Sequence, residues 1–317
     1  HWDFYEIHIV LRRSMDGGAT WEPMQVIASD GDNTIGNPCV VVDKDTATVW
    51  VVYCKNNTQV YTIHSKDNGI TWSDPHEITA QVKLDGWTWY GIGPGHGIQL
   101  HNGKLVIPSN HMDTPRGMRG SPIFLKSHII YSDDHGSNWK IGGALYMSSG
   151  ECQLAETSQG ALYMTIRNSS SGEAIARKPK RRLFSQSNDD GKNWSSISEV
   201  ESILDPGCHA SVITLPNPDP KINQDLLLLA NPASTDLRRN MTLRISYDEG
   251  KSWSVSKVLY SGRSGYSDLA TTDDNIILCF YEQGTNQTCV ERMVFSQFNL
   301  EWLTSAPPPF RHWGSDD

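Results

Sequence analysis

The sequence lacks the features of several large classes of protein. No apolar run approaches the roughly 20 residues of a membrane-spanning helix, so no such span is predicted. Basic residues (27) are fewer than acidic ones (36), and the net charge of -9 disfavours a nucleic-acid partner, since phosphate binding needs a basic face. The six cysteines form no Cys-x-x-Cys pair, so no zinc site is predicted. No helical period stands out either, which leaves short strands as the main structural element.

The cysteines and glycosylation sequons leave the cellular location open. Cys39 could bridge to Cys54, and Cys279 to Cys289, but buried free thiols are an equal alternative. One of the five sequons, at Asn193, is discounted because Trp stands at its middle position. The sequons lean weakly towards a secreted or lysosomal protein, and they lie at Asn56, Asn168, Asn193, Asn240 and Asn286.

One eight-residue pattern occurs five times in the chain. Its form is Ser-x-Asp-x-Gly-x-(Thr/Asn/Ser)-Trp, and the copies occupy 14–21, 65–72, 132–139, 187–194 and 246–253. Each copy predicts a hairpin turn. The Asp should accept a hydrogen bond from the backbone N–H two residues on, and the Gly should adopt a positive φ. The Trp should pack the turn against the next strand.

The spacing of the copies predicts the architecture. The Asp residues at 16, 67, 134, 189 and 248 lie 51, 67, 55 and 59 residues apart. A repeat of this size, built of short strands, is typical of four-stranded propeller blades. The series resembles the Asp boxes of sialidases, which implies an all-β, six-bladed β-propeller. We expect the propeller to occupy residues 1–305 and a tail to occupy 306–317.

The start of the chain resembles part of the sialidase pattern. Asp3 stands nine residues before Arg12, which opens an Arg-Arg-Ser-x-Asp box, and the resemblance implies that Asp3 is the general acid/base. An exposed Asp near a chain end is the alternative. The family also has an Arg-Ile-Pro strand and a further Arg upstream, and neither is present here. We therefore expect that N-terminal strands of the first blade, and one arm of an arginine clamp, are missing.

Three residues further along resemble the remaining catalytic group. Tyr266, between Gly and Ser, resembles the sialidase nucleophile, with an ordinary turn Tyr as the alternative. A Glu-x-Gln strand followed by an apolar strand ending in Arg-Asn implies that Glu151 activates the Tyr and that Arg167 binds substrate. An Arg at the inner end of an apolar strand needs an anion in any case, from either a buried carboxylate or a ligand.

Other candidates for the substrate site rest on the same resemblance. Arg238 would be a second clamp residue, although a one-residue slip would select Arg239 instead. Glu282 would brace the arginines. Asn37 would contact the substrate amide or merely cap a turn. The glycine-rich stretch at 91–97 resembles a sialidase loop that lies beside the glycerol and amide side of the sugar. Trp87 and Trp89 would line this side of the substrate site, and core packing is the alternative for each of them. The basic run at 177–182 is predicted to be a solvated loop.

These residue types fit one reaction. The resemblance implies a retaining exo-α-sialidase that removes terminal sialic acids from glycoproteins, gangliosides or oligosaccharides without a metal or other cofactor. A neutral phenol avoids the repulsion that a carboxylate nucleophile would meet beside the substrate carboxylate, and arginine forks pair well with that carboxylate. The alternatives are a hydrolase of a related nonulosonic or ulosonic acid and a non-catalytic, lectin-like propeller that binds sialoglycans.

Overall fold

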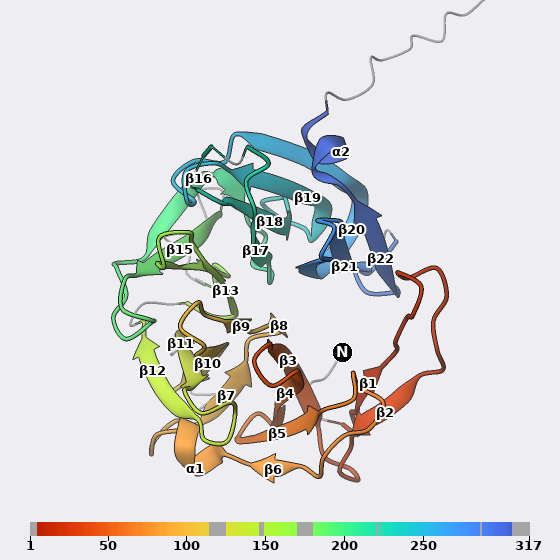
Figure 1. Cartoon of the computed structure of the whole chain (residues 1–317), viewed down its shortest axis with the longest axis vertical. Coiled ribbons are helices and arrows are strands. Elements are labelled where there is room, and N and C mark those ends of the chain that lie inside the picture. Colours follow the sequence, from red (N-terminus) through yellow and green to blue (C-terminus); the bar gives the residue numbers. More distant parts are fainter. Residues whose placement is uncertain are drawn as a thin grey trace, which may run out of the picture.

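The strands of the chain are arranged as propeller blades around a central axis (Figure 1). The computed structural model describes residues 5–113, 125–145, 149–169, 180–219, 221–222, 224–285 and 287–305. Asp3 and the expected tail at 306–317 lie outside these residues. Within them the only helices are the short α1 (Thr79–Val82) and α2 (Leu300–Thr304), and neither is long enough to cross a membrane. The predicted all-β class is confirmed.

Four blades follow one another along the chain, each with four antiparallel strands. The first contains β3 (Ile35–Asp43), β4 (Thr48–Lys55), β5 (Gln59–Ser65) and β6 (His76–Glu77). The second contains β7 (Trp89–Ile92), β10 (Leu105–Met112), β11 (Lys126–Ser132) and β12 (Lys140–Ala144). The third contains β13 (Cys152–Glu156), β14 (Leu162–Ile166), β15 (Arg181–Ser187) and β16 (Ser198–Leu204). The fourth contains β17 (Ser211–Leu215), β18 (Leu226–Pro232), β19 (Arg239–Ser246) and β20 (Val255–Thr271).

The two ends of the described chain contact each other. The second half of β20 leaves the fourth blade and pairs with β21 (Ile277–Gln283), which pairs with β22 (Arg292–Phe298). A two-stranded sheet of β1 (Ile9–Leu11) and β2 (Gln25–Ala28) lies beside them (Figure 1). The turn between β1 and β2 contacts β22: the Trp21 and Phe295 rings meet edge to face at 5.2 Å, and Gln297 donates to the Gly17 carbonyl. The short helix α2 follows directly after β22.

All five repeated turns have the same hydrogen bonds. The Ser hydroxyl donates to the Asp carboxylate, which also accepts from the backbone N–H four residues on at 2.8–2.9 Å. The prediction of a bond from two residues on is therefore wrong. Two successive residues after the Asp have positive φ and curl the chain further than a simple Asx-turn does. The positive φ of the box glycine is confirmed, at 79–91°.

The glycine-rich stretch at 91–97 lets backbones touch. A Cβ on Gly93 would lie 2.9 Å from the Cys152 carbonyl oxygen, and one on Gly97 would lie 2.7 Å from that of Val106. The stretch forms only short strands: the end of β7, then β8 (Gly95–His96), which runs parallel to β3, and β9 (Ile98–Gln99), which pairs with β10. These contacts show that the glycines serve close packing between the inner strands of different blades.

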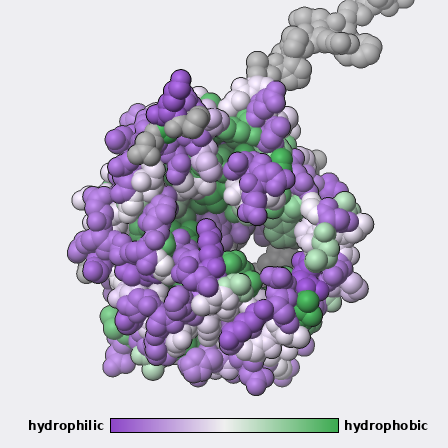
Figure 2. Space-filling model, viewed as in Figure 1, coloured by the Kyte–Doolittle hydropathy of each residue, from purple (hydrophilic) through white to green (hydrophobic). Residues whose placement is uncertain are grey.

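Apolar side chains fill the space between neighbouring blades, and the cysteines take part in this packing. One cluster joins Cys39 and Val52 of the first blade to Ile92 and Ile107 of the second. All six thiols are free and five are buried, so the alternative of free thiols holds and the two possible disulfides are not formed. Figure 2 shows a mostly hydrophilic outer face, with hydrophobic residues coming into view mainly around the central hollow.

Most of the sequons are poorly placed for glycosylation. The Asn168 side chain is buried and donates to the Arg181 carbonyl at 3.0 Å. The Asn193 amide donates to the Asp of its own box, and the Asn56 amide donates to Asn33 at 2.7 Å. Three of the four sequon amides in the described residues therefore make hydrogen bonds.

A buried histidine pair in the second blade should make stability depend on pH. The Nδ1 atoms of His111 and His128 lie 3.0 Å apart, and His128 Nε2 lies 3.0 Å from the Tyr90 hydroxyl. Burial lowers the pKa of His111 to about 4 and that of His128 well below its usual value. In the unfolded chain both rings take up a proton near pH 6.5. The stability from keeping them neutral is therefore present above about pH 6.5 and lost as the pH falls below it.

We expect the free energy of unfolding in urea to drop by on the order of 1–2 kcal/mol per buried ring between about pH 7 and pH 5. NMR titration should show both rings still neutral at about pH 5 in the folded chain. The variant His76→Gln removes an exposed histidine of the outer strand β6 and should leave the pH dependence unchanged. Equal stability at the two pH values would contradict the prediction.

Candidate active site

Tyr266 lies at an irregularity of strand β20. Ser264 pairs with Gln283 and Ser267 pairs with Tyr281, so the strand between them carries an extra residue and bulges. Such bulges redirect side chains. Gly265 is required here because a Cβ would collide with the Glu282 carboxylate, which accepts a hydrogen bond from the Tyr266 backbone N–H at 2.8 Å. The Glu282 carboxylate thus fixes the backbone that carries Tyr266.

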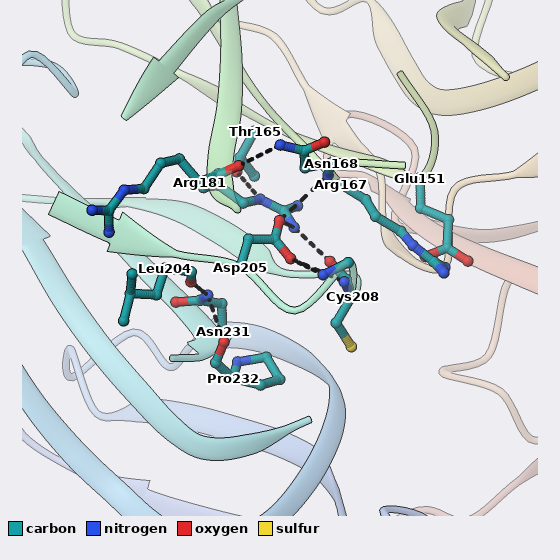
Figure 3. A network of polar contacts seen from close by, with 12 residues as sticks. Glu151, Thr165, Arg167, Asn168, Arg181, Leu204, Asp205, Cys208, Asn231 and Pro232 are labelled. Carbon is teal, nitrogen blue, oxygen red and sulfur yellow. Dashed lines mark hydrogen bonds and ion pairs between the residues drawn. The ribbon is translucent and has the colours of Figure 1, made fainter. Parts of the chain in front are cut away.

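Glu151 and Arg167 flank a pair of antiparallel strands. Because Cys152 of β13 pairs with Ile166 of β14, the residue before the first strand and the residue after the second lie at the same end. The Arg167 backbone N–H donates to the Glu151 carbonyl at 2.9 Å, and the guanidinium Nη1 donates to Glu151 Oε2 at 2.7 Å. Figure 3 shows the two side chains pointing towards each other. The anion that Arg167 was expected to need is a carboxylate of the protein.

Tyr266 joins this pair from a different sheet. Its hydroxyl donates to Glu151 Oε1 and accepts from Arg167 Nη1 at 3.0 Å. The phenol is therefore held at both its donor and its acceptor positions. A carboxylate that accepts a phenol proton in a hydrogen bond is also placed to take that proton during a reaction.

The protonation states follow from burial and charge. Burial raises the pKa of Tyr266 well above 10, and the negative charge of Glu151 raises it further. Burial alone would raise the pKa of Glu151 as well. The positive charge of Arg167, a smaller contribution from His209 and the hydrogen bonds from Tyr266 and Arg167 together outweigh burial, so that pKa lies below its usual value. In the free site the proton therefore resides on Tyr266, and Glu151 is an anion.

These residues line a cavity of about 580 Å³. Among the described residues, the charged ones that line the cavity are Glu151, Arg167 and Arg238. Their charges leave one net positive charge in the cavity, whereas the whole chain has a net charge of -9. The Arg167 Nε makes no hydrogen bond. The cavity thus suits a ligand with one anionic group. The amides that face the same space belong to Asn37, Asn57 and Asn110.

Arg238 lies immediately before β19 and faces Tyr266. Its guanidinium carbon lies 5.3 Å from the centre of the Tyr266 ring, and Nη2 makes a long bond of 3.4 Å to the Gly207 carbonyl. The next residue, Arg239, points elsewhere and pairs with Asp236 at 3.6 Å on the exposed surface. Of the two residues between which the sequence left a choice, Arg238 lines the cavity.

Two of the three further candidates line the cavity. Asn37 does so from β3, where the pairing with β4 is irregular and its φ is 52°. Trp89 lines it from β7. Trp87 does not: its ring stacks on His111 at 3.5 Å, in the core of the second blade. For Trp87, which lies in a turn before β7, the structure supports the alternative of core packing.

A buried ion pair supports the site from behind, and sequence reasoning missed it. Arg182 belongs to the basic run predicted to be solvated, yet it is 1% exposed. It donates to Asp205 at 2.9 Å, to Thr165 at 2.8 Å and to the Cys208 carbonyl at 2.5 Å. Asp205 also accepts from the backbone N–H groups of the turn at 207–208 (Figure 3). This network fixes Gly207, whose carbonyl accepts from Arg238.

Comparison with known proteins agrees with this arrangement. The family model described as "BNR repeat-like domain" matches residues 4–279. A sialidase of Bacteroides fragilis (strain YCH46) is 31% identical over 93% of this chain and 56% of its own length. One from Micromonospora viridifaciens is 30% identical over 95% and 48%. The solved structure titled Hadza microbial sialidase Hz136 has a TM-score of 0.80 and 32% identity, over 93% of this chain and 60% of that one.

The chain spans about half the length of the curated relatives named above. The match to the family model nevertheless covers most of the chain, and the resemblance of the five Asp boxes to those of sialidases is confirmed. The chain therefore belongs to the BNR repeat-like domain family and is related to the sialidases.

Proposed function

We propose that this chain is the catalytic part of a retaining exo-α-sialidase that removes terminal sialic acids from glycoconjugates. The observation that carries the proposal is the hydrogen-bonded group of Tyr266, Glu151 and Arg167 in a cavity with one net positive charge. The similarity to proteins named sialidases supports it.

The cavity suits the charge of such a substrate. A sialic acid carries one carboxylate on its anomeric carbon, and planar guanidinium groups form paired, charge-assisted hydrogen bonds with a carboxylate. Arg167 and Arg238 both face the cavity and retain free donors, because five N–H groups are available on each guanidinium. We infer that these two residues bind the substrate carboxylate, with Asn37 and Trp89 as further contacts.

The reaction would proceed through a covalent intermediate, as in other sialidases with a Tyr nucleophile. The Tyr266 oxygen attacks the anomeric carbon while its proton passes to Glu151, and the glycosidic bond breaks. The leaving oxygen takes a proton from an acid, a role that we assign to Asp3. Water then attacks the same carbon, its proton passes to Asp3, and Tyr266 leaves and recovers its proton from Glu151. Two displacements at one carbon retain its configuration.

We also propose that the ring has six blades. The four complete blades are followed by the sheet of β20, β21 and β22, and then by that of β1 and β2. The contacts of the first Asp-box turn with β22 support this closure.

The function can be tested with release of a fluorogenic alcohol from an α-linked sialoside. In the variant Glu151→Gln the side chain keeps its shape and still accepts a hydrogen bond, but it cannot take the Tyr266 proton. We expect kcat to fall on the order of 10²–10⁴-fold with little change in KM. The matched control is Glu77→Gln, which alters an exposed Glu that pairs with Tyr61 on an outer strand and should leave activity unchanged.

Calorimetry with an unsaturated sialic acid analogue separates the alternatives. Binding without turnover in the unmodified chain would favour the lectin-like alternative. Turnover of a related ulosonic acid glycoside, but not of the sialoside, would favour the related hydrolase. The absence of both turnover and binding would contradict the proposed function.

A further inference from the structure

His209 lies directly behind Tyr266 and has an unusual environment. Its side chain is 1% exposed, and the centre of its ring lies 5.5 Å from that of Tyr266, with the planes tilted by 45°. Neither ring nitrogen has a hydrogen-bond partner. Buried polar groups are nearly always paired, so an imidazole without partners beside the proposed nucleophile needs an explanation.

The ring is surrounded by charged groups from several blades. Those that face it are Glu151 before β13, Arg182 on β15, Asp268 on β20 and His96 on β8. His96 and Asp268 bind each other at 2.7 Å, and the Ser211 hydroxyl donates to the same Asp268 oxygen at 3.1 Å. Asp268 thus already has two hydrogen-bond partners, His96 and Ser211. Glu151 is the other anion near His209, and it binds the Tyr266 hydroxyl.

The position of the ring is fixed from two sides. A Cβ on Gly95 would lie 3.3 Å from His209 Cε1, so the backbone of the glycine-rich stretch packs closely against the ring. On the other side, His209 continues the turn that Asp205 holds through the backbone N–H groups of Gly207 and Cys208. The ring therefore has little freedom to move away from Tyr266.

We propose that His209 is a positioning residue for Tyr266 that sets the acid limit of the reaction. As a neutral ring it packs against the phenol and keeps the hydroxyl on Glu151. As an imidazolium it draws the Glu151 carboxylate into an ion pair and weakens the bond from Tyr266. This inference rests on the proposed function.

The sign of the effect follows from the surroundings of the ring. Burial lowers the pKa of His209 to about 4, although the charges of Glu151 and Asp268 oppose the shift. Above this value the ring is neutral and Glu151 remains free to accept the Tyr266 proton. As the pH falls through it, the ring gains a second N–H donor, and the nearby positive charge makes Glu151 a weaker base. Activity should therefore decline on the acid side as His209 is protonated.

The pH dependence of kcat/KM distinguishes this role from mere packing. The variant His209→Gln removes the titrating group and keeps a polar side chain. We expect its kcat near neutral pH to fall, because the ring contact with Tyr266 is lost, and its acid limb to move to lower pH by about half a unit or more. The variant His209→Ala removes the ring, and we expect kcat to fall roughly tenfold with little change in KM. An unchanged acid limb in His209→Gln would overturn the proposal.

Two further measurements make the test specific. The variant His101→Gln removes a largely exposed histidine and should leave the acid limb unchanged. NMR titration of imidazole signals, assigned from the spectrum of His209→Gln, should show a lower pKa for His209 in Glu151→Gln, because a neighbouring anion is removed. This readout needs no turnover. An inactive chain that shows the coupling would count against the proposed function alone, whereas an unchanged titration would overturn the role of His209.

Discussion

Replacing Tyr266 with Phe should reduce kcat for an α-linked sialoside by on the order of 10³-fold or more. The change removes one oxygen atom, which donates to Glu151 and accepts from Arg167 at 3.0 Å. The ring would remain in place, because its packing against His209 and Arg238 does not involve the hydroxyl. Affinity for an unsaturated analogue should change little, since the carboxylate contacts that we propose for Arg167 and Arg238 do not involve the hydroxyl.

A matched control exists on an outer strand of the first blade. Tyr61 also donates to a glutamate, Glu77, at 3.2 Å, but this pair is exposed. The variant Tyr61→Phe should leave kcat and KM unchanged. Mass spectrometry after reaction with a fluorinated sialic acid offers a second readout, because a covalent adduct should form on the unmodified chain and not on Tyr266→Phe. An adduct on another residue, or near-normal turnover by Tyr266→Phe, would reject Tyr266 as the nucleophile.

Replacing Asp205 with Asn should destabilise the fold by about 3–5 kcal/mol. The change keeps the shape of the side chain but leaves Arg182 as a buried charge without an anionic partner. It also weakens the cap on the turn at 207–208. Because the Gly207 carbonyl accepts from Arg238, we expect KM for the sialoside to rise as well. Urea unfolding and steady-state kinetics measure the two effects.

An exposed pair provides the comparison. Asp133 pairs with Lys140 at 2.8 Å, both with about half of their side chains exposed, and Asp133→Asn should cost under about 1 kcal/mol. The double variant Arg182→Met, Asp205→Leu removes both charges and should recover part of the loss. Recovery should be incomplete, because the backbone N–H groups of 207 and 208 would lose their acceptor. A cost for Asp205→Asn as small as that for Asp133→Asn would show that the buried pair is not needed.

The elements that could be predicted from the sequence depend on local patterns. Each Asp box specifies its own turn through residues that touch within eight positions. The proximity of Glu151 and Arg167 also follows from the sequence. In two adjacent antiparallel strands, the residue before the first strand and the residue after the second lie side by side. The choice of Arg238 over Arg239 needed the structure, since both flank the same strand end. The hydrogen-bond pattern within the box needed it too, since two successive positive φ values are not evident from Asn68 or Glu249.

The remaining features depend on contacts between blades. Arg182 stands in a run of basic residues that is typical of a solvated loop, and only the closure of the third blade on the turn after β16 provides Asp205 as its partner. The buried His209 has charged neighbours on β8, β15 and β20, which are far apart in sequence. Trp87 and Trp89 have the two-residue spacing of neighbours on one face of a strand, but β7 begins only at the second of them.

The long strand β20 belongs to two sheets, and Tyr266 lies on its second half. Its first half pairs with β19, and the Ser264 backbone N–H donates to the Arg238 carbonyl at 3.1 Å. Tyr266 and Arg238 are thus carried by neighbouring backbone segments that hydrogen-bond to each other, so their separation is set mainly by the pairing of β19 with β20. We expect these two groups to tolerate little remodelling. Changes in the size or decoration of the sugar that the protein accepts would then arise at the opposite wall, where Asn37 and Trp89 come from separate blades.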